Sequence, residues 1–182
     1  MRSVDDIISF IESDDWIMNL LRAVGHLNEA DCWLAAGGIR NSIWAKLHGV
    51  QFDAPDENDV DVVFYDKSDC SRSKETSYEN YLGSLVPMVK WEVRNQARMH
   101  LKNTDDPYRD CFNALEHWPD TPTAIGARLH LNQVEILAPY GIEDLVGLVV
   151  RQTPKFIQKR QIYEKRIEEK NWRKKWPLLT II

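Results

Sequence analysis

The sequence has little cysteine and no hydrophobic run long enough to cross a bilayer. Its three cysteines, Cys32, Cys70 and Cys111, lie far apart and form no CxxC pair, so neither a disulfide framework nor a zinc site is indicated. No apolar stretch approaches the roughly 20 residues of a transmembrane helix. The N-terminus, MRSVDDIISF, has acids where a signal peptide needs a basic start and an apolar core. We therefore expect a cytoplasmic protein with reduced thiols and no membrane partner.

Histidine shows no catalytic pattern either. The five histidines are scattered, without HxxxH spacing or a nucleophile elbow, so we assign none of them to catalysis. With 182 residues and 43% hydrophobic content, the chain is long enough for one core and short for two. We predict a single domain over 1–182, with N-terminal helices at 3–28 and a basic C-terminal helix at 153–176 packed on it.

Positive charge is concentrated near the C-terminus. Residues 151–176 contain ten of the 23 basic residues and three of the 28 acidic ones, a balance of +7 within a net charge of −5, so the remainder carries −12. Such a block can solvate a helix or attract phosphates. The segment KNWRKKWP interleaves bases with Trp172 and Trp176, which can either stack on nucleic acid or dock the tail onto the domain.

A glycine turn follows the first predicted strand. The apolar run at 32–36 ends at Gly37 and Gly38, and helical periodicity then continues to a capping glycine. A strand–turn–helix of this kind presents free backbone N–H groups at the positive end of a helix, where phosphate oxygens can approach glycine closely. Arg40 and Ser42 can reinforce such a site. The simpler interpretation is a tight structural connection.

Two aspartates interrupt the next predicted strand, which follows a turn-rich loop at 51–58. Period-two alternation places Asp59 and Asp61 on one face and Val60, Val62 and Phe64 on the other. Neighbouring carboxylates repel each other and are costly to bury unpaired. Oxygen ligands without histidine or cysteine suit Mg²⁺ or Mn²⁺. Solvation or pairing with Lys or Arg is the alternative.

A third carboxylate can come from either of two later strands. The segment VKWEVRNQARMH is predicted as a strand with one apolar and one charged face. Glu92 lies in the middle of the charged face, and Lys90 or Arg94 beside it could meet substrate phosphates or form cross-strand ion pairs. Glu135 is the rival, although Arg128 on its partner strand could simply pair with it. The sequence leaves this choice open.

The remaining elements are predicted from periodicity and end signals. We expect helices over 4–11, 16–24, 78–85, 108–115 and 142–149, and a hairpin of strands 123–129 and 134–138 joined around Asn132.

Taken together, these segments resemble the signature of the DNA polymerase beta-like nucleotidyltransferase superfamily, in which a Gly-Gly or Gly-Ser pair precedes an Asp-x-Asp strand. Four blocks, WLAAGGIRNSIW, NDVDVVFYD, WEVRNQARMH and APYGIEDL, are similar to those of a bacterial family of small nucleotidyltransferase-like proteins. The resemblance spans 30–176. It implies an α+β fold with a mixed β-sheet flanked by helices.

The resemblance also implies an activity and its residues. A nucleoside monophosphate would pass from an NTP to an acceptor hydroxyl, with pyrophosphate leaving. Gly37 and Gly38 would hold the triphosphate through backbone amides, and Asp59 and Asp61 would bind Mg²⁺. Glu92 would help to bind a second metal and deprotonate the acceptor.

One position departs from the pattern. Many active relatives have serine where this chain has Gly38, so a hydroxyl contact to the γ-phosphate would have to come from elsewhere, for example Ser42. This departure motivates an alternative hypothesis, a catalytically inactive module that binds a nucleotide or a partner protein. A third hypothesis is nucleic-acid binding by the basic C-terminal helix. Because the rest of the chain carries −12, we expect a small-molecule or protein acceptor before a long nucleic acid. Acceptor, base preference and oligomeric state stay open.

Overall fold

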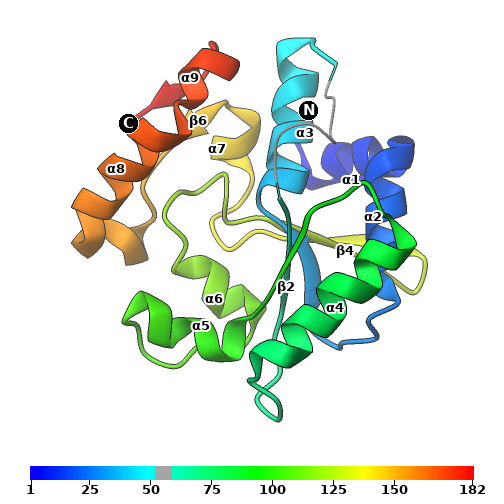
Figure 1. Ribbon diagram of the computed structural model, residues 1–182. Coiled ribbons are helices and arrows are strands. Elements are labelled where there is room, and N and C mark those ends of the chain that lie inside the picture. Colours follow the sequence, from blue (N-terminus) through cyan, green and yellow to red (C-terminus); the bar gives the residue numbers. More distant parts are fainter. Residues whose placement is uncertain (52–58) are drawn as a thin grey trace.

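The computed structural model describes residues 1–51 and 59–182, and its centre is a five-stranded mixed sheet (Figure 1). The strand order is β3-β2-β1-β4-β5; β2 and β3 are parallel, and the other pairs are antiparallel. The strands are β1 (Cys32–Ala35), β2 (Val60–Phe64), β3 (Trp91–Asn95), β4 (Gly126–His130) and β5 (Gln133–Leu137). This mixed sheet with flanking helices confirms the predicted α+β class. The predicted loop at 51–58 lies, apart from its first residue, outside the described residues.

Helices cover the sheet on both sides. In Figure 1, α1, α2 and α4 lie on one side of the molecule, and α8 and α9 lie on the other. The helices before β3 are α1 (Val4–Ser13), α2 (Asp15–Gly25), α3 (Gly37–His48) and α4 (Arg72–Leu85). After β3 come α5 (Gln96–Asn103), α6 (Cys111–Glu116), α7 (Glu143–Val146), η2 (Pro154–Lys159), α8 (Arg160–Lys170) and α9 (Trp172–Lys175). A small parallel pair, β6 (Val149–Val150) and β7 (Thr180–Ile181), closes the chain.

Local signals in the sequence explain most element ends. Ser3 forms a capping box with Asp6 at the start of α1, and Asp14 caps α2. The hairpin turn between β4 and β5 has positive φ at both Leu131 and Asn132, the backbone of a type I′ turn that matches strand twist. The hairpin predicted around Asn132 is confirmed.

Six predicted boundaries are wrong. The helix predicted over 78–85 begins at Arg72, because the Ser71 side chain caps it, and the strand predicted over 123–129 begins at Gly126. The segment after β3 turns into α5 at Gln96, because the Asn95 side chain accepts a hydrogen bond from the Ala97 N–H and caps a helix. The helix predicted over 108–115 begins at Cys111, capped by Asp110. The helix predicted over 142–149 ends at Val146, because the next residues pair with β7.

The last error concerns 153–176, for which the sequence predicts one helix. It consists of η2, α8 and α9, with a left-handed break at Asn171 (φ 43°) between α8 and α9. The break lets Trp172 and Trp176 turn inward. Their rings meet Trp44 of α3 edge-on, at centroid distances of 5.6 and 6.2 Å. The tail therefore docks onto the domain through its tryptophans, the second of the two roles considered for them.

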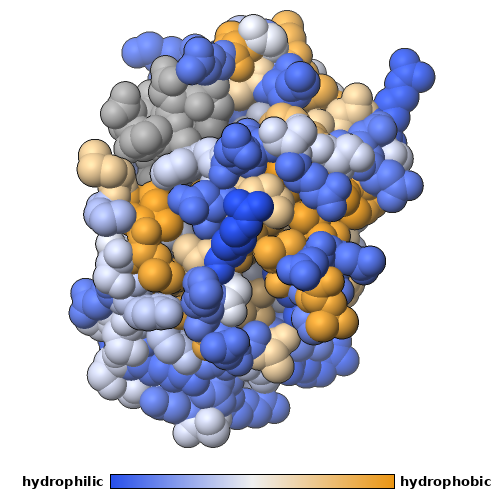
Figure 2. All heavy atoms as spheres, turned by 90° about the vertical axis from the view of Figure 1, so that its right-hand side faces the viewer, coloured by the Kyte–Doolittle hydropathy of each residue, from blue (hydrophilic) through white to orange (hydrophobic). Residues whose placement is uncertain are grey.

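The protein surface is largely polar on the side that carries α1, α2 and α4. Figure 2 shows this face, where hydrophilic residues predominate and apolar residues appear between them. Among the helices of the described part of the chain, none is long and apolar enough to cross a membrane.

Candidate active site

The parallel pairing of β2 and β3 brings two of the predicted carboxylates together. Asp61 is the direct partner of Glu92 in the register of this pair, so their side chains emerge on the same face of neighbouring strands, about 5 Å apart at the backbone. Asp59 immediately precedes β2, and all three carboxylates line one cavity. On its other side, Asp61 faces Ala35 at the end of β1, next to the start of α3.

Each outer carboxylate has a basic partner. Asp59 accepts an ion pair from Lys90 at 2.5 Å, and Glu92 accepts one from Arg94 at 2.7 Å. Arg94 also contacts Glu79 at 2.6 Å. The carboxylates therefore form a cluster and also make ion pairs, the two alternatives that the sequence left open. The carboxylates converge on one cavity, and its edge is neutralised by Lys and Arg.

Glu135, the rival for third carboxylate, lies elsewhere. It belongs to β5, three strand spacings from β2, which is about 14 Å. Its side chain pairs with Arg128 at 2.6 Å. The strand order therefore places Glu92, and not Glu135, beside Asp61.

The start of α3 has an unusual backbone. Ala36 is its N-cap residue with φ 50° and ψ −121°, and no side chain caps the helix. The positive φ thus falls on Ala36, whereas Gly37 and Gly38 occupy the first helical positions. A non-glycine residue in this region is strained, and such strain is concentrated at functional sites. The uncapped N–H groups of the first turn remain available to an anion.

Neither the position of Gly38, where many relatives have serine, nor Ser42 directs a side chain into the cavity. A Cβ on Gly38 would meet the side chain of Leu34 at 3.7 Å. The Ser42 hydroxyl donates a hydrogen bond to the Gly38 carbonyl at 3.0 Å, and Ser42 is buried. The cavity is lined by Gly37 and by neither of these residues.

Arg40 lines the same cavity and belongs to a buried polar network. Its guanidinium donates to Asn41 Oδ1 and, at 2.6 Å, to Thr123 Oγ1. It also lies over the rings of Trp44 and Trp172, at 4.9 and 4.7 Å from their centroids. Burial lowers the pKa of Arg40 to about 10, although Asp120 opposes this shift. Arg40 therefore keeps its positive charge at neutral pH.

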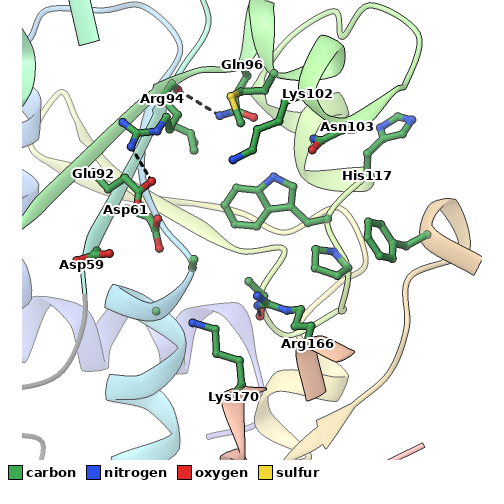
Figure 3. A pocket seen from close by; sticks show the side chains of 18 of the residues that line it. Asp59, Asp61, Glu92, Arg94, Gln96, Lys102, Asn103, His117, Arg166 and Lys170 are labelled. Atoms are coloured by element: carbon green, nitrogen blue, oxygen red, sulfur yellow. Dashed lines mark hydrogen bonds and ion pairs between the residues drawn. The ribbon is translucent and has the colours of Figure 1, made fainter. Parts of the chain in front are cut away.

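Further cations line the cavity from helices that the sequence did not connect with the aspartates. Lys102 comes from α5, and Arg166 and Lys170 come from α8. In Figure 3, Arg166 and Lys170 lie across the cavity from Lys102. Arg166 is held by Asp120, which is fully buried and lies 3.0 Å from its Nε. The cavity has a volume of about 670 Å³, within the range of small-molecule sites.

The sequence marks Arg166 and Lys170 as part of a basic block but does not predict that they line the cavity. Arg166 and Lys170 belong to the basic block at 151–176, which could equally have been a solvated helix. Only the docking of Trp172 and Trp176 on Trp44 turns α8 toward the carboxylates. Lys102 lies in α5, which begins inside the segment predicted as a strand.

Asp61 has a higher proton affinity than an ordinary carboxylate. Burial raises the pKa of Asp61 to about 6, and Glu92 adds to the shift, while Arg40 opposes it. Acidic oxygens and no histidine or cysteine surround this point, which is the donor chemistry that Mg²⁺ and Mn²⁺ prefer. In their present ion-paired orientations, no three His, Cys, Asp or Glu side chains within 1–51 and 59–182 are grouped to hold a metal. The donor set fits such an ion once Glu92 and Asp59 turn from their basic partners.

Comparison with known proteins agrees with this geometry. A family model described as nucleotidyltransferase matches residues 22–181. An NMR structure described as revealing a CCA-adding enzyme head domain is 32% identical, with a TM-score of 0.88, over 100% of this chain and 97% of the other. A comparison with functionally curated proteins finds no match.

Longer enzymes share the fold at lower identity. A CCA-adding enzyme in complex with CTP is 16% identical, with a TM-score of 0.56, and the Thermotoga maritima CCA-adding enzyme complexed with tRNA is 16% identical, with a TM-score of 0.53. Each covers all of this chain, which spans 43% and 42% of their respective lengths. The predicted polymerase beta-like fold is confirmed by the match to the head domain, and the chain belongs to the nucleotidyltransferase family.

Proposed function

We propose that this protein is a Mg²⁺-dependent nucleotidyltransferase that moves a nucleoside monophosphate from an NTP to an acceptor hydroxyl. The observation that carries the proposal is the register of β2 and β3, which sets Asp61 beside Glu92 at the start of α3. Family membership supports nucleotidyl transfer in general. The metal requirement and the acceptor are the further parts of the proposal.

The carboxylates would hold the metal. Asp59, Asp61 and Glu92 supply oxygen donors on one side of the cavity. Bound Mg²⁺ or Mn²⁺ would neutralise charge on the α-phosphate and on the attacking and leaving oxygens. Glu92 would take the proton of the acceptor hydroxyl once Arg94 no longer holds it.

The cations of the cavity would bind the triphosphate. The free N–H groups at the start of α3, where Gly37 lines the cavity, would receive a phosphate oxygen without competition from a capping side chain. Arg40 and Arg166 are fixed by buried partners, whereas Lys102 and Lys170 form no ion pair with any residue in 1–51 or 59–182. Two anchored and two adaptable cations suit a ligand with several phosphate charges. Arg94 would contribute after it is released from Glu92.

Purified protein incubated with each α-labelled NTP, Mg²⁺ or Mn²⁺ and a panel of acceptors tests the proposal. We expect labelled product and pyrophosphate, and a loss of at least about a hundredfold in Asp61→Asn and in Glu92→Gln. Glu135→Gln is the matched control, because Glu135 is 39% exposed and paired with an arginine, as Glu92 is at 38%. It should keep full activity. Equal activity of Asp61→Asn and wild type would refute the assignment.

The acceptor has two candidate classes. A small molecule or protein was predicted from the −12 charge of the rest of the chain. The 32% identical structure, described as a CCA-adding enzyme head domain, adds an RNA 3′ hydroxyl as a second candidate. Lys165, an exposed basic residue that lines the cavity, favours this candidate. The acceptor panel should therefore contain tRNA lacking its 3′ end beside sugars, nucleosides and proteins.

A regulatory nucleotide-binding module remains the alternative function. It is favoured by the burial of Ser42 and the orientation of Gly38, which leave no hydroxyl of α3 toward the cavity. NTP binding that depends on Asp61, without pyrophosphate release for any acceptor, would support this alternative over catalysis.

A further inference from the structure

The end of the cavity away from the carboxylates has its own polar and aromatic residues. Asn103 and His117 lie on the opposite side from Asp59 and Asp61 in Figure 3. Trp118, whose side chain is partly exposed, and the largely buried Phe156 line the same cavity. The proposed transfer chemistry uses none of these side chains.

Tyr108 determines the orientation of the Asn103 amide. The buried Tyr108 hydroxyl donates its hydrogen to Asp105 Oδ2 at 2.5 Å. A hydroxyl has only one hydrogen, so it must accept the contact from Asn103, which lies at 3.0 Å. The amide nitrogen therefore faces Tyr108. Asn103 Oδ1 is left as an acceptor that is bonded to no described residue.

His117 is oriented by the same kind of argument. Its Nδ1 lies 2.8 Å from the Asn113 backbone carbonyl, which can only accept, so Nδ1 carries the hydrogen. In the neutral ring Nε2 is then an acceptor, and it bonds no residue in the described part of the chain. The ring packs on Tyr108 with a centroid distance of 5.0 Å. Asn103 and His117 are thus held by one tyrosine, and each has an acceptor to offer.

The neighbouring Trp118 is fixed through its backbone. Its carbonyl accepts a hydrogen bond from the hydroxyl of Thr153, which is fully buried, at 2.5 Å. A partly exposed indole on a fixed backbone is a stacking surface for a planar ring. Between this end and the carboxylates lies Lys102, with Arg166 on the other wall (Figure 3). A ring bound here would have its phosphates toward these cations.

We infer that Asn103, His117 and Trp118 form a nucleobase subsite that selects bases carrying an exocyclic amino group. The inference rests on the proposed function, because it assigns the base end of the same nucleotide. Two acceptors can receive the hydrogens of the adenine or cytosine amino group. Uracil or hypoxanthine would present a carbonyl oxygen at that place and only one ring N–H beside it, so at least one of the two acceptors would lose its hydrogen bond. A site that receives a hydrogen bond from its ligand discriminates against a ligand that lacks the donor.

Equilibrium binding of matched nucleotide pairs tests the subsite on the full chain. Titrations at pH 8 with Mg²⁺ would compare ATP with ITP, and CTP with UTP, as non-hydrolysable α,β-methylene analogues. Within each pair the ligands differ at the amino position and in the hydrogen on the adjacent ring nitrogen. We expect Kd to be about tenfold lower, or more, for the amino-bearing member of each pair.

Two variants locate the discrimination. Asn103→Leu should bring the ATP/ITP ratio of Kd values close to one, and Trp118→Leu should weaken all four analogues about tenfold with little change in the ratios. Asn80→Leu, on the exposed surface of α4, is the control and should bind like wild type. Thermal melts verify that each variant is folded.

The outcomes separate this inference from the function on which it rests. Equal affinities within both pairs, in wild-type protein that binds Mg²⁺–tripolyphosphate, would overturn the subsite and leave triphosphate binding standing. If none of the four analogues binds, and tripolyphosphate does not bind either, both the subsite and the proposed function are overturned. Selectivity that Asn103→Leu retains in a folded variant would also overturn the assignment.

Discussion

The two faces of the five-stranded sheet are built from alternate residues of the same strands and serve different purposes. In β2, Val60, Val62 and Phe64 are buried in the larger core beneath α1, α2 and α4. Between them, Asp61 points to the other face and into the cavity, where only part of the sheet is covered by a smaller cluster around Trp33 and Cys111. A strand period of two therefore lets five residues supply a core and a site at once.

The difference lies in what each face can tolerate. The larger core is close-packed and has no place for a charge. On the cavity face the charge of Asp61 is already unfavourable, because burial and, to a smaller extent, the neighbouring Glu92 raise its pKa. Mutations at neighbouring positions of β2 should accordingly have opposite effects on stability.

The largest expected effect is on the apolar face. Val62 is fully buried, so Val62→Asp would place an unpaired carboxylate in the core and should lower the free energy of unfolding by at least about 3 kcal/mol. Urea denaturation monitored by circular dichroism measures this. Val62→Ala, which leaves only a cavity, should cost less. A folded Val62→Asp protein of wild-type stability would break the distinction between the faces.

One residue earlier, the expected effect has the opposite sign. Because the pKa of Asp61 rises from 3.8 to about 6 on folding, the folded state binds the extra proton, and this contribution to stability is present below pH 4 and lost as the pH rises through 6. Asp61→Asn should therefore be more stable than wild type at pH 7.5, by about 1–3 kcal/mol, and the difference should shrink toward pH 4.

Denaturation in EDTA, repeated between pH 4 and 7.5, checks this prediction. Glu135→Gln again serves as the control, since Glu135 has a basic partner and lies at the far edge of the sheet. A stability difference for Asp61→Asn that does not vary with pH would contradict the electrostatic explanation.

The smallest effect concerns the dynamics of the two faces. Cys32 belongs to the larger core and Cys111 to the smaller cluster, and both are buried, whereas Cys70 is exposed. Burial raises the pKa values of both buried thiols well above the ordinary value. A thiol reagent should therefore modify one cysteine of the native protein at once and the other two only after opening.

Mass spectrometry of the labelled peptides would sharpen the comparison. We expect Cys111 to react before Cys32, because the cluster over the cavity face is smaller and should open with a lower free energy. Cys70→Ser supplies the control for the fast phase. Simultaneous reaction of Cys32 and Cys111 would mean that both faces open as one cooperative unit.

Much of the candidate site was accessible to sequence reasoning. Alternation in β2 set Asp61 apart from its apolar neighbours, and the order strand, glycines, helix predicted α3 correctly. The segment β2–α4–β3 is a strand–helix–strand unit, and such units pair their strands in parallel. That rule would have favoured Glu92 over Glu135, because β5 reaches the sheet through an antiparallel hairpin at its other edge.

The sequence by itself determined which residue types alternate, where most helices and turns begin, and that carboxylates, glycines and a basic block coexist in one chain. These are local properties, encoded by periodicity and capping. Only the tertiary structure decided that Asp61 lies beside Glu92, that Ser42 turns inward, and that Arg166 and Lys170 face the carboxylates. The physical reason is that the docking of Trp172 and Trp176 on Trp44 orients α8, and contacts between distant segments of this kind have no local signature.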